Sequence, residues 1–382
     1  MSRLRWMVAS VVAAFAAASP AAAVDDTLLL KQAQQLFKML PKDMGTPDLP
    51  LTTARVELGR ILFFDPRFTI DANMSCTTCH QPALYGTDGL ATSIGVQQRP
   101  HPRNAPTILN SALSITHWRG DRDSVEDQVI KAMTSPITFG QPNEKAVLDR
   151  LARIPGYAPL FKAAFPDDAA AMTAQSIAKA IGAFERTLVT PSPFDAYLAG
   201  NVDALSPTAR AGLEKFVSTG CIGCHEGVGV GGTMYRKFGV IEDYWNATGS
   251  QIIDKGRVDV TKAPDDLYVF RVPSLRNVAM TGPYFHDGSV AALRDAVRVM
   301  ARVQLGVTLT DADTRDIVAF LESLTEGSLR FFSETRIGEK REVLLEGSIV
   351  RKWVYTLNSR KAKESIPAKG GEKRCLAMGV GS

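Results

Sequence analysis

Two short segments rich in cysteine and histidine limit how this chain can fold. The sequence reads "CTTCH" at residues 76–80 and "CIGCH" at residues 221–225. The chain has 382 residues with only 5 cysteines and 5 histidines, so most of its thiols lie in these two segments. C-x-x-C-H is the attachment signal of a c-type haem, in which both thiols bond the porphyrin and the histidine binds iron. The sequence therefore predicts two covalently held haems, attached at Cys76, Cys79 and His80 and at Cys221, Cys224 and His225.

Two other kinds of site also use a C-x-x-C pair. A thioredoxin-like redox pair needs two reactive thiols, and it has no need of the histidine that follows both copies. A zinc site needs four ligands, and the chain has almost no further cysteine or histidine at matching spacing. Haem attachment is therefore the favoured interpretation. The fifth cysteine, Cys375, is assigned no role.

The composition is that of a globular, exported protein. Hydrophobic residues make up 45% and charged residues 22% of the chain, and the formal net charge is +4. These values exclude a disordered chain and give no nucleic-acid signature. Residues 1–23 combine Arg3 and Arg5 with a short apolar run and then small residues, which predicts a signal peptide cleaved after Ala23. The alternative is an N-terminal membrane anchor; we expect export to the periplasm.

Helical periodicity dominates the sequence, and the alternation typical of strands is nearly absent. The order helix, C-x-x-C-H, long loop and closing helix occurs twice, which indicates a weak internal duplication. We therefore predict an all-α protein with two cytochrome c-like haem domains, residues 24–200 and 201–327, and long irregular loops. The segment 190–200 is interpreted as a linker between the two domains.

Residues 328–382 form a basic C-terminal extension. They hold 12 of the 44 Lys and Arg residues but only 6 of the 40 Asp and Glu residues, so they carry the positive charge of the whole chain. Such a segment can dock an acidic partner or an anionic surface. The composition favours the simpler interpretation, a poorly ordered extension.

The residue at the sixth position of each iron decides what a haem does. A methionine opposite the histidine raises the reduction potential and suits electron transfer, whereas an open position permits reaction with an oxidant. Met300 follows the second motif inside an amphipathic stretch. A methionine in such a stretch usually packs in the core, so the residues alone favour packing over iron ligation.

Longer segments of the chain resemble the bacterial dihaem cytochrome c peroxidases. They are "ELGRILFFDPR", "CTTCHQPALYGTDGLATSIG", "PRNAPTILN", "HWRGDRDSVEDQ", "AFERTLVTPSPFDAYLAG", "CIGCH", "VFRVPSLRNVAMTGPYFHDGSVAALRDAVRVM" and "IVAFLESL". They occur in the family's order from about residue 55 to residue 325. The resemblance implies two cytochrome c-like domains, two covalent haems and the reduction of hydrogen peroxide, and it leaves out the basic extension.

The resemblance implies different roles for the two haems. The C-terminal haem, bound through His225, would have Met300 as its second axial ligand and accept electrons from outside, which reverses the preference for packing. The N-terminal haem, bound through His80, would be the peroxide site. Trp118 matches a tryptophan that lies between the haems, where an indole gives electrons a polarizable path. The simpler alternative for Trp118 is a packed aromatic ring.

The family also implies a calcium ion between the two domains. Asn104 would provide its side-chain oxygen, and Thr281 and Pro283 would provide backbone carbonyls. Oxygen ligands together with several waters suit Ca²⁺. His286 matches a position near the second haem, and we interpret it as a hydrogen-bonding residue rather than an iron ligand.

The departures from the family concern the peroxide site. Many members have a histidine after "SIG" that caps the iron until reduction moves it away; here this position is Val96, and His101 lies five residues later. Gln128 matches the family's distal glutamine, but the Glu-Met pair ten residues further on is Thr138-Phe139 here. Threonine donates a hydrogen bond but does not cycle a proton near neutral pH, and the loss of acid–base help costs about 10²–10⁴ in rate.

Three functions follow as hypotheses. The first is a periplasmic cytochrome-c peroxidase-type oxidoreductase that reduces H2O2 with electrons from a small cytochrome c or cupredoxin, with Gln128, Trp118 and Thr138 at the catalytic site. The second uses peroxide to oxidise a partner protein or a small molecule, as the methylamine-dehydrogenase-maturing relatives do; those replace the methionine ligand by tyrosine. The third is a dihaem electron carrier with both irons six-coordinate. A homodimer is also expected, and a nucleic-acid partner is not.

Overall fold

The computed structural model describes residues 26–327, and helices dominate this range. The predicted signal peptide, residues 1–23, and the basic extension, residues 328–382, lie outside the described residues. The predicted all-α class is confirmed as mostly α; residues 26–327 contain one short antiparallel pair of strands, β1 (Tyr235–Lys237) and β2 (Val269–Arg271). Between residues 26 and 327, no helix is long and apolar enough to cross a membrane.

A first group of helices surrounds the N-terminal motif. It consists of α2 (Thr53–Phe64), α3 (Cys76–Cys79), α4 (Val125–Thr134), α5 (Glu144–Ala152), α6 (Tyr157–Ala164) and α7 (Ala174–Glu185). Except for α3 and α6, each begins at a side chain that accepts a hydrogen bond from the first turn, as N-caps do: Thr52, Ser124, Asn143 and Thr173. The apolar faces of these helices bury one hydrophobic core, built from residues between 56 and 188.

A second group of helices accompanies the C-terminal motif. It consists of α8 (Pro193–Leu198), α9 (Pro207–Thr219), α10 (Tyr244–Thr248), α11 (Val258–Thr261), α12 (Leu293–Leu305) and α13 (Asp311–Glu322). The first helix of the described range, α1 (Asp26–Leu36), contributes Leu29 and Ala33 to the same core as α8, α9 and α13. Short 3-10 turns lie in the loops, among them Val96–Gln98 in the loop between α3 and α4 and Cys221–Gly223 in the second motif. Contacts group all described residues in one compact unit, and the predicted boundary at residue 200 stays a prediction.

The segment 190–200, which the sequence predicted to be a linker, forms helix α8. Ser192 and Asp195 make a capping box, and the Ser192 amide donates to the Asp195 carboxylate at 2.9 Å. Phe194 and Tyr197 are completely buried in the second core. The linker interpretation was wrong, because this segment forms a buried helix; Pro193 stands at the first position of α8, where proline is favourable.

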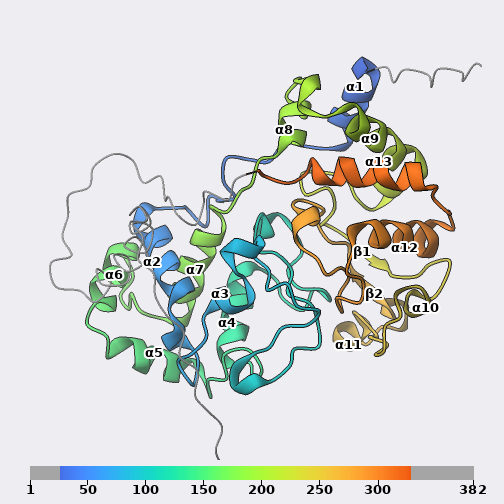
Figure 1. Ribbon diagram of the computed structural model, residues 1–382. Helices are drawn as coiled ribbons and strands as arrows, with labels where there is room; N and C mark the ends of the chain where they lie inside the picture. The colour runs from blue at the N-terminus through green and yellow to red at the C-terminus, as the bar shows by residue number, and fades with distance from the viewer. Residues whose placement is uncertain (1–25, 328–382) are drawn as a thin grey trace, which may run out of the picture. The chain divides into compact units, whose positions relative to one another are not determined.

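The helix before each haem motif crosses the closing helix of its group at a glycine (Figure 1). A Cβ added at Gly59 of α2 would lie 1.8 Å from the Ala180 carbonyl oxygen of α7. A Cβ added at Gly212 of α9 would lie 1.8 Å from the Asp316 carbonyl oxygen of α13. Only glycine lets the two backbones approach so closely, and the same device in both halves supports the predicted internal duplication.

Gly212→Ala tests this contact. The added methyl group must push α9 away from α13, and overpacking of this kind costs about 1–3 kcal/mol. We expect the free energy of unfolding of the haem-loaded protein, measured by denaturant titration, to fall by that amount. Gly156→Ala is the matched control, because a Cβ at Gly156 meets nothing within 4 Å. An equal loss in both variants would contradict the close-contact explanation.

Candidate haem sites

The residues of the second motif and Met300 line one cavity. Cys221, Cys224 and His225 reach it from the turn that follows α9, and Met300 reaches it from α12. The remaining lining is mainly apolar, as the ring of a haem requires, and includes Phe216, Phe238, Phe270, Val272, Leu275, Val297, Leu309 and Leu321. The structure therefore brings together the four side chains that the sequence assigned to this haem.

Helix α12 presents Met300 to this cavity as part of a continuous stripe. Leu293, Ala296, Val297 and Met300 all line it, at the i, i+3, i+4, i+7 spacing of one helix face. Met300 is partly buried and packs against the cluster that contains Trp118 and Phe238. Its placement thus satisfies both interpretations weighed from the sequence, packing and access to an iron held by His225.

His225 is held in the orientation that an iron ligand needs. The ring is buried, and Nδ1 lies 3.4 Å from the Val230 carbonyl oxygen. Burial lowers the pKa of His225 to about 4, so the imidazole is neutral at pH 7. Because Nδ1 donates its proton to the carbonyl, the lone pair of Nε2 is free for a metal.

The first motif repeats this arrangement. Cys76 to Cys79 form a single helical turn, α3, which begins at a capping box between Ser75 and Thr78. Nδ1 of His80 lies 2.9 Å from the Gly86 carbonyl oxygen, which again leaves Nε2 free. Burial lowers the pKa of His80. Both motif histidines are therefore neutral and have one nitrogen available to iron.

The cysteines of the motifs lack the properties of the competing sites. All four are free thiols here, and burial raises the pKa of Cys79 and of Cys221 to about 11. A reactive redox pair needs a lowered thiol pKa instead. Across residues 26–327, no three His, Cys, Asp or Glu side chains come together to hold a metal ion. The thiols are placed for covalent attachment to a porphyrin rather than for disulfide exchange.

Trp118 lies beside the C-terminal cavity in a fixed position. Its indole Nε1 donates to the Asn104 carbonyl oxygen at 2.9 Å. The buried guanidinium of Arg271 lies over the ring, 5.4 Å from its centre, and the His286 ring is 6.4 Å away, centre to centre. Trp118 also lines a second cavity, which reaches Thr87, the neighbour of Gly86. The indole therefore lies beside both cavities.

The second cavity contains the three residues assigned to calcium. Asn104, Thr281 and Pro283 all line it. The side-chain amide nitrogen of Asn104 donates to the Leu90 carbonyl at 2.9 Å, which leaves the side-chain oxygen of Asn104 as the free acceptor. The neutral oxygens of an amide and of backbone carbonyls fit the ligand preference of Ca²⁺, so the residues present are compatible with the ion that the resemblance implies.

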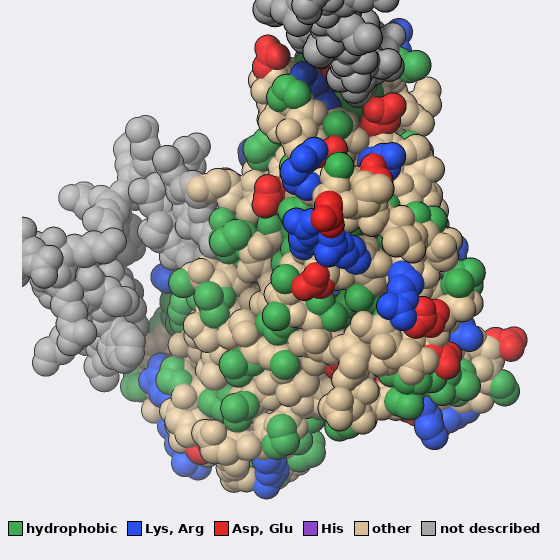
Figure 2. Space-filling view, turned by 45° about the vertical axis from the view of Figure 1, so that its right-hand side comes forward, with side chains coloured by type: hydrophobic (Ala, Val, Ile, Leu, Met, Phe, Trp, Pro, Cys, Tyr) green, Lys and Arg blue, Asp and Glu red, His purple; other side chains and the backbone are tan. Residues whose placement is uncertain are grey.

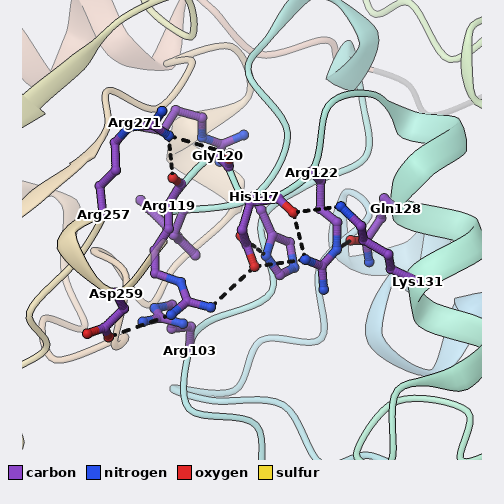
Figure 3. A network of polar contacts seen from close by, with 12 residues as sticks. Arg103, His117, Arg119, Gly120, Arg122, Gln128, Lys131, Arg257, Asp259 and Arg271 are labelled. Carbon is purple, nitrogen blue, oxygen red and sulfur yellow. Dashed lines mark hydrogen bonds and ion pairs between the residues drawn. The ribbon is translucent and has the colours of Figure 1, made fainter. Parts of the chain in front are cut away.

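The residues assigned to the peroxide site have separate partners. Gln128, in α4, accepts a hydrogen bond at Oε1 from Arg122 Nε at 3.0 Å. Arg122 is paired with Asp121 at 2.8 Å, and Asp121 also binds His117 at 2.9 Å (Figure 3). Thr138 instead donates to the Ser135 hydroxyl at 3.0 Å, in the turn that follows α4. The structure thus adds a charged network to Gln128 and leaves Thr138 outside it.

The loop that carries Val96 is held together by hydrogen bonds between its own backbone groups. Val96 is completely buried, and the His101 amide donates to the Ser93 carbonyl at 2.8 Å. Burial is the main cause that lowers the pKa of His80, and repulsion from His117 and His101 adds to it, so both histidines lie near the first motif. Nε2 of His101 is buried without a hydrogen-bond partner.

Sequence reasoning missed the arginines around these sites. Arg122 holds Gln128, and Arg271 covers Trp118. The density of charges in "HWRGDRD" was a usable signal for the first of them, because such a cluster beside a buried tryptophan needs internal pairing. No local signal pointed to Arg271, which donates to the Ile115 carbonyl across 156 positions of the chain.

Comparisons with known proteins agree with this geometry. Residues 53–203 match the family model described as di-haem cytochrome c peroxidase. The chain is 40% identical over 311 residues to the cytochrome c551 peroxidase of Pseudomonas aeruginosa, which covers 81% of this chain and 89% of that protein. It is 33% identical over 288 residues to the methylamine utilization protein MauG of Methylorubrum extorquens, which covers 72% of this chain and 79% of that protein.

A solved structure supports the same relationship. A MauG-like protein associated with microbial copper homeostasis is 29% identical and superposes with a TM-score of 0.68, over 78% of this chain and 97% of that one. The similarity to the Pseudomonas enzyme extends over most of both chains, and both C-x-x-C-H motifs are placed for covalent haems. The chain therefore belongs to the di-haem cytochrome c peroxidase family and is a peroxidase-type oxidoreductase with two c-type haems.

Proposed function

We propose that this protein reduces hydrogen peroxide to water in the periplasm, with electrons from a small redox protein, a cytochrome c or a cupredoxin. The reaction consumes two electrons and two protons for each H2O2 and forms two water molecules. A haem iron with an open coordination position supplies the place where the O–O bond is broken. The observation that carries the proposal is the position of Trp118, which lines both the Met300 cavity and the cavity that leads to Thr87.

Two exposed apolar side chains lie close to the C-terminal cavity. Leu305, at the end of α12, lines the C-terminal cavity and is 36% exposed. Ile241 is 63% exposed, and its amide donates to the Val303 carbonyl of the same helix. We propose that the donor docks at the edge formed by these two side chains, because a small apolar contact suits a transient electron-transfer complex; Arg302 and Glu242, which pair with each other, flank it.

Surface charge gives little selectivity for the donor. On the face in Figure 2, basic and acidic side chains are intermingled, with neither sign gathered in a large patch. Long-range steering of a strongly charged partner needs a field of one sign. The donor and the homodimer both stay predictions.

We propose that Gln128 donates a hydrogen bond to a ligand at the His80 haem. A guanidinium only donates hydrogen bonds, so the atom of Gln128 that faces Arg122 must be the carbonyl oxygen. The amide NH2 then points away from Arg122 and is free for peroxide. Thr138 provides no group that cycles a proton, so we expect slow O–O cleavage in an otherwise intact site.

Met300→Ala tests the assignment of the electron-transfer haem. Thioether ligation favours the ferrous state, and axial ligands set haem potentials over a range of about 0.8 V. We expect the reduction potential of the C-terminal haem to fall in a redox titration, and electron entry to slow. Met39→Ala is the control, since Met39 is 52% exposed and outside the cavity. An unchanged potential in Met300→Ala would leave Met300 with a packing role alone.

We also propose that one calcium ion occupies the second cavity, at Asn104, Thr281 and Pro283. Removal of the ion by a chelator should loosen the contacts around Trp118, since the backbone carbonyl of Asn104 accepts the indole hydrogen bond. Peroxidase activity should fall on chelation and return when Ca²⁺ is added back. Metal analysis of the purified protein should find about one calcium per chain. A protein without calcium would contradict the assignment of this site.

The distal loop leads to a further expectation about the N-terminal iron. Val96 has no group that ligates iron and is completely buried. His101 faces the Ile137 carbonyl, which raises its pKa against the larger effect of burial, and its Nε2 lies 3.0 Å from the Cβ position of Gly95. The loop thus holds His101 within its own fold, and the inhibitory cap found in many relatives should be missing.

The resting spectrum tests this expectation. The ferric N-terminal haem should be at least partly high-spin in the isolated protein and should react with H2O2 without prior reduction of the other haem. If His101 moves to the iron, the resting protein will be fully low-spin, and His101→Gly will restore the high-spin signal. A fully low-spin spectrum that survives His101→Gly would favour an electron carrier over a peroxidase.

A further inference from the structure

A continuous row of aromatic rings leads from Trp118 to the surface. The centres of the Trp118 and His286 rings are 6.4 Å apart, and those of His286 and Tyr244 are 5.3 Å apart. Tyr244 is 5.1 Å from Trp245, and Trp245 is 5.0 Å from Tyr268. We call these five residues the aromatic relay. Electron tunnelling weakens steeply with distance, so rings in such close succession conduct electrons far better than the same distance of aliphatic side chains.

The inner end of the relay is buried, and its outer end contacts solvent. Trp118, His286 and Tyr244 are buried, whereas Trp245 and Tyr268 are half-buried. Phe270 stacks on His286 at 4.3 Å and Phe238 stacks on Tyr244 at 4.8 Å, centre to centre, which keeps water from the inner rings. Trp118 and His286 also line the cavity of the C-terminal haem. One end of the relay therefore contacts a redox site, and the other contacts solvent.

Charges along the relay favour oxidation toward the surface. The guanidinium of Arg271 covers Trp118, so a positive charge on that indole is opposed by a cation 5.4 Å from its centre. The carboxylates of Asp254 and Asp287 lie near Tyr244 and, after burial, help to raise its pKa, and Asp254 is itself paired with Arg103 at 2.7 Å. An electron vacancy thus becomes more stable as it moves away from the Arg271 guanidinium.

Tyr244 passes electrons but cannot end the path. Its hydroxyl donates to the Asp254 main-chain carbonyl at 3.2 Å and accepts from the Asp254 amide at 2.9 Å. A carbonyl is no base, so an oxidised Tyr244 has no neighbour to take its proton. Trp245 and Tyr268 reach water, where a proton can leave. The stable end of the path is therefore this half-buried pair, which contacts solvent.

We propose that Trp245 and Tyr268 form a second oxidation site, which takes electrons from small phenolic reductants and passes them through Tyr244, His286 and Trp118 to the haem sites. The proposal rests on the peroxidase function. Two phenol molecules each lose one electron to the pair and one proton to water, which leaves two phenoxyl radicals. The two electrons, with two protons taken from solvent, convert one H2O2 into two water molecules.

The decisive variant removes the outer pair and keeps its packing. Trp245→Phe combined with Tyr268→Phe retains two aromatic rings but replaces both oxidisable side chains. Oxidation of guaiacol by H2O2 and the haem-loaded protein should fall about tenfold or more, which corresponds to at least about 1.4 kcal/mol in the barrier. Oxidation of reduced cytochrome c should be unchanged, because those electrons enter through the Met300 haem.

Tyr197→Phe is the matched control. Its hydroxyl is buried without a partner, and the residue lies in the second core, outside the relay. This variant should oxidise both reductants at the wild-type rate. Guaiacol oxidation that is undiminished in the double variant, while cytochrome c oxidation proceeds, would overturn the relay and leave the proposed function intact. Wild-type protein that oxidises neither reductant would overturn both.

A second measurement does not depend on turnover. When the haem-loaded protein receives H2O2 without any reductant, the electrons must come from the protein itself. Peptide mass spectrometry should then find oxidised Trp245 and Tyr268, and electron paramagnetic resonance should detect a radical that is absent from the double variant. Oxidation confined to other residues, or a radical unchanged in the double variant, would contradict the proposal.

Discussion

The hydrogen bond that fixes each motif histidine is the constraint on which both haem sites depend. In both motifs Nδ1 points at a backbone carbonyl five or six residues further on, that of Gly86 for His80 and that of Val230 for His225. Without this bond the ring could present either nitrogen, and the iron would compete with a proton. The returning loop is therefore as much a part of the ligand set as the cysteines are.

These loops reach their position by unusual backbone conformations. Gly86 has φ of +73°, and a Cβ there would meet the Ile108 side chain at 2.9 Å. Val230 has φ of +51°, which is rare for a β-branched residue and costs free energy. Val230 is completely buried, so surrounding packing holds it in this state. The strain occurs at the residue whose carbonyl orients His225, which is where a functional constraint would place it.

Much of this architecture could be predicted from local sequence signals. The C-x-x-C-H motifs are contiguous, and helices such as α7 and α12 repeat their apolar residues at helical spacing. Features made by distant residues could not be predicted: Met300 has the same pattern as a core residue, and the three-residue strands β1 and β2 pair across more than thirty positions. Arg122 and Arg271 gain their roles only when the fold brings them to Gln128 and Trp118.

In the proposed function Trp118 is where the electron routes would meet, and its surroundings suit transient rather than lasting oxidation of the ring. Burial lowers the pKa of Arg271 to about 10, so the guanidinium over the indole remains charged at pH 7 and opposes a lasting vacancy on the ring. The indole N–H donates to the Asn104 carbonyl, which is no base, so an electron crosses Trp118 without its proton.

Asn104 connects this bridge with the second cavity. Its backbone carbonyl accepts the indole hydrogen bond, and its backbone N–H donates to the His286 carbonyl at 2.8 Å. Its side chain lines the cavity assigned to calcium. An ion bound to that side chain would fix the same residue that fixes Trp118 and reaches His286. Metal binding and electron transfer would then be coupled through one residue.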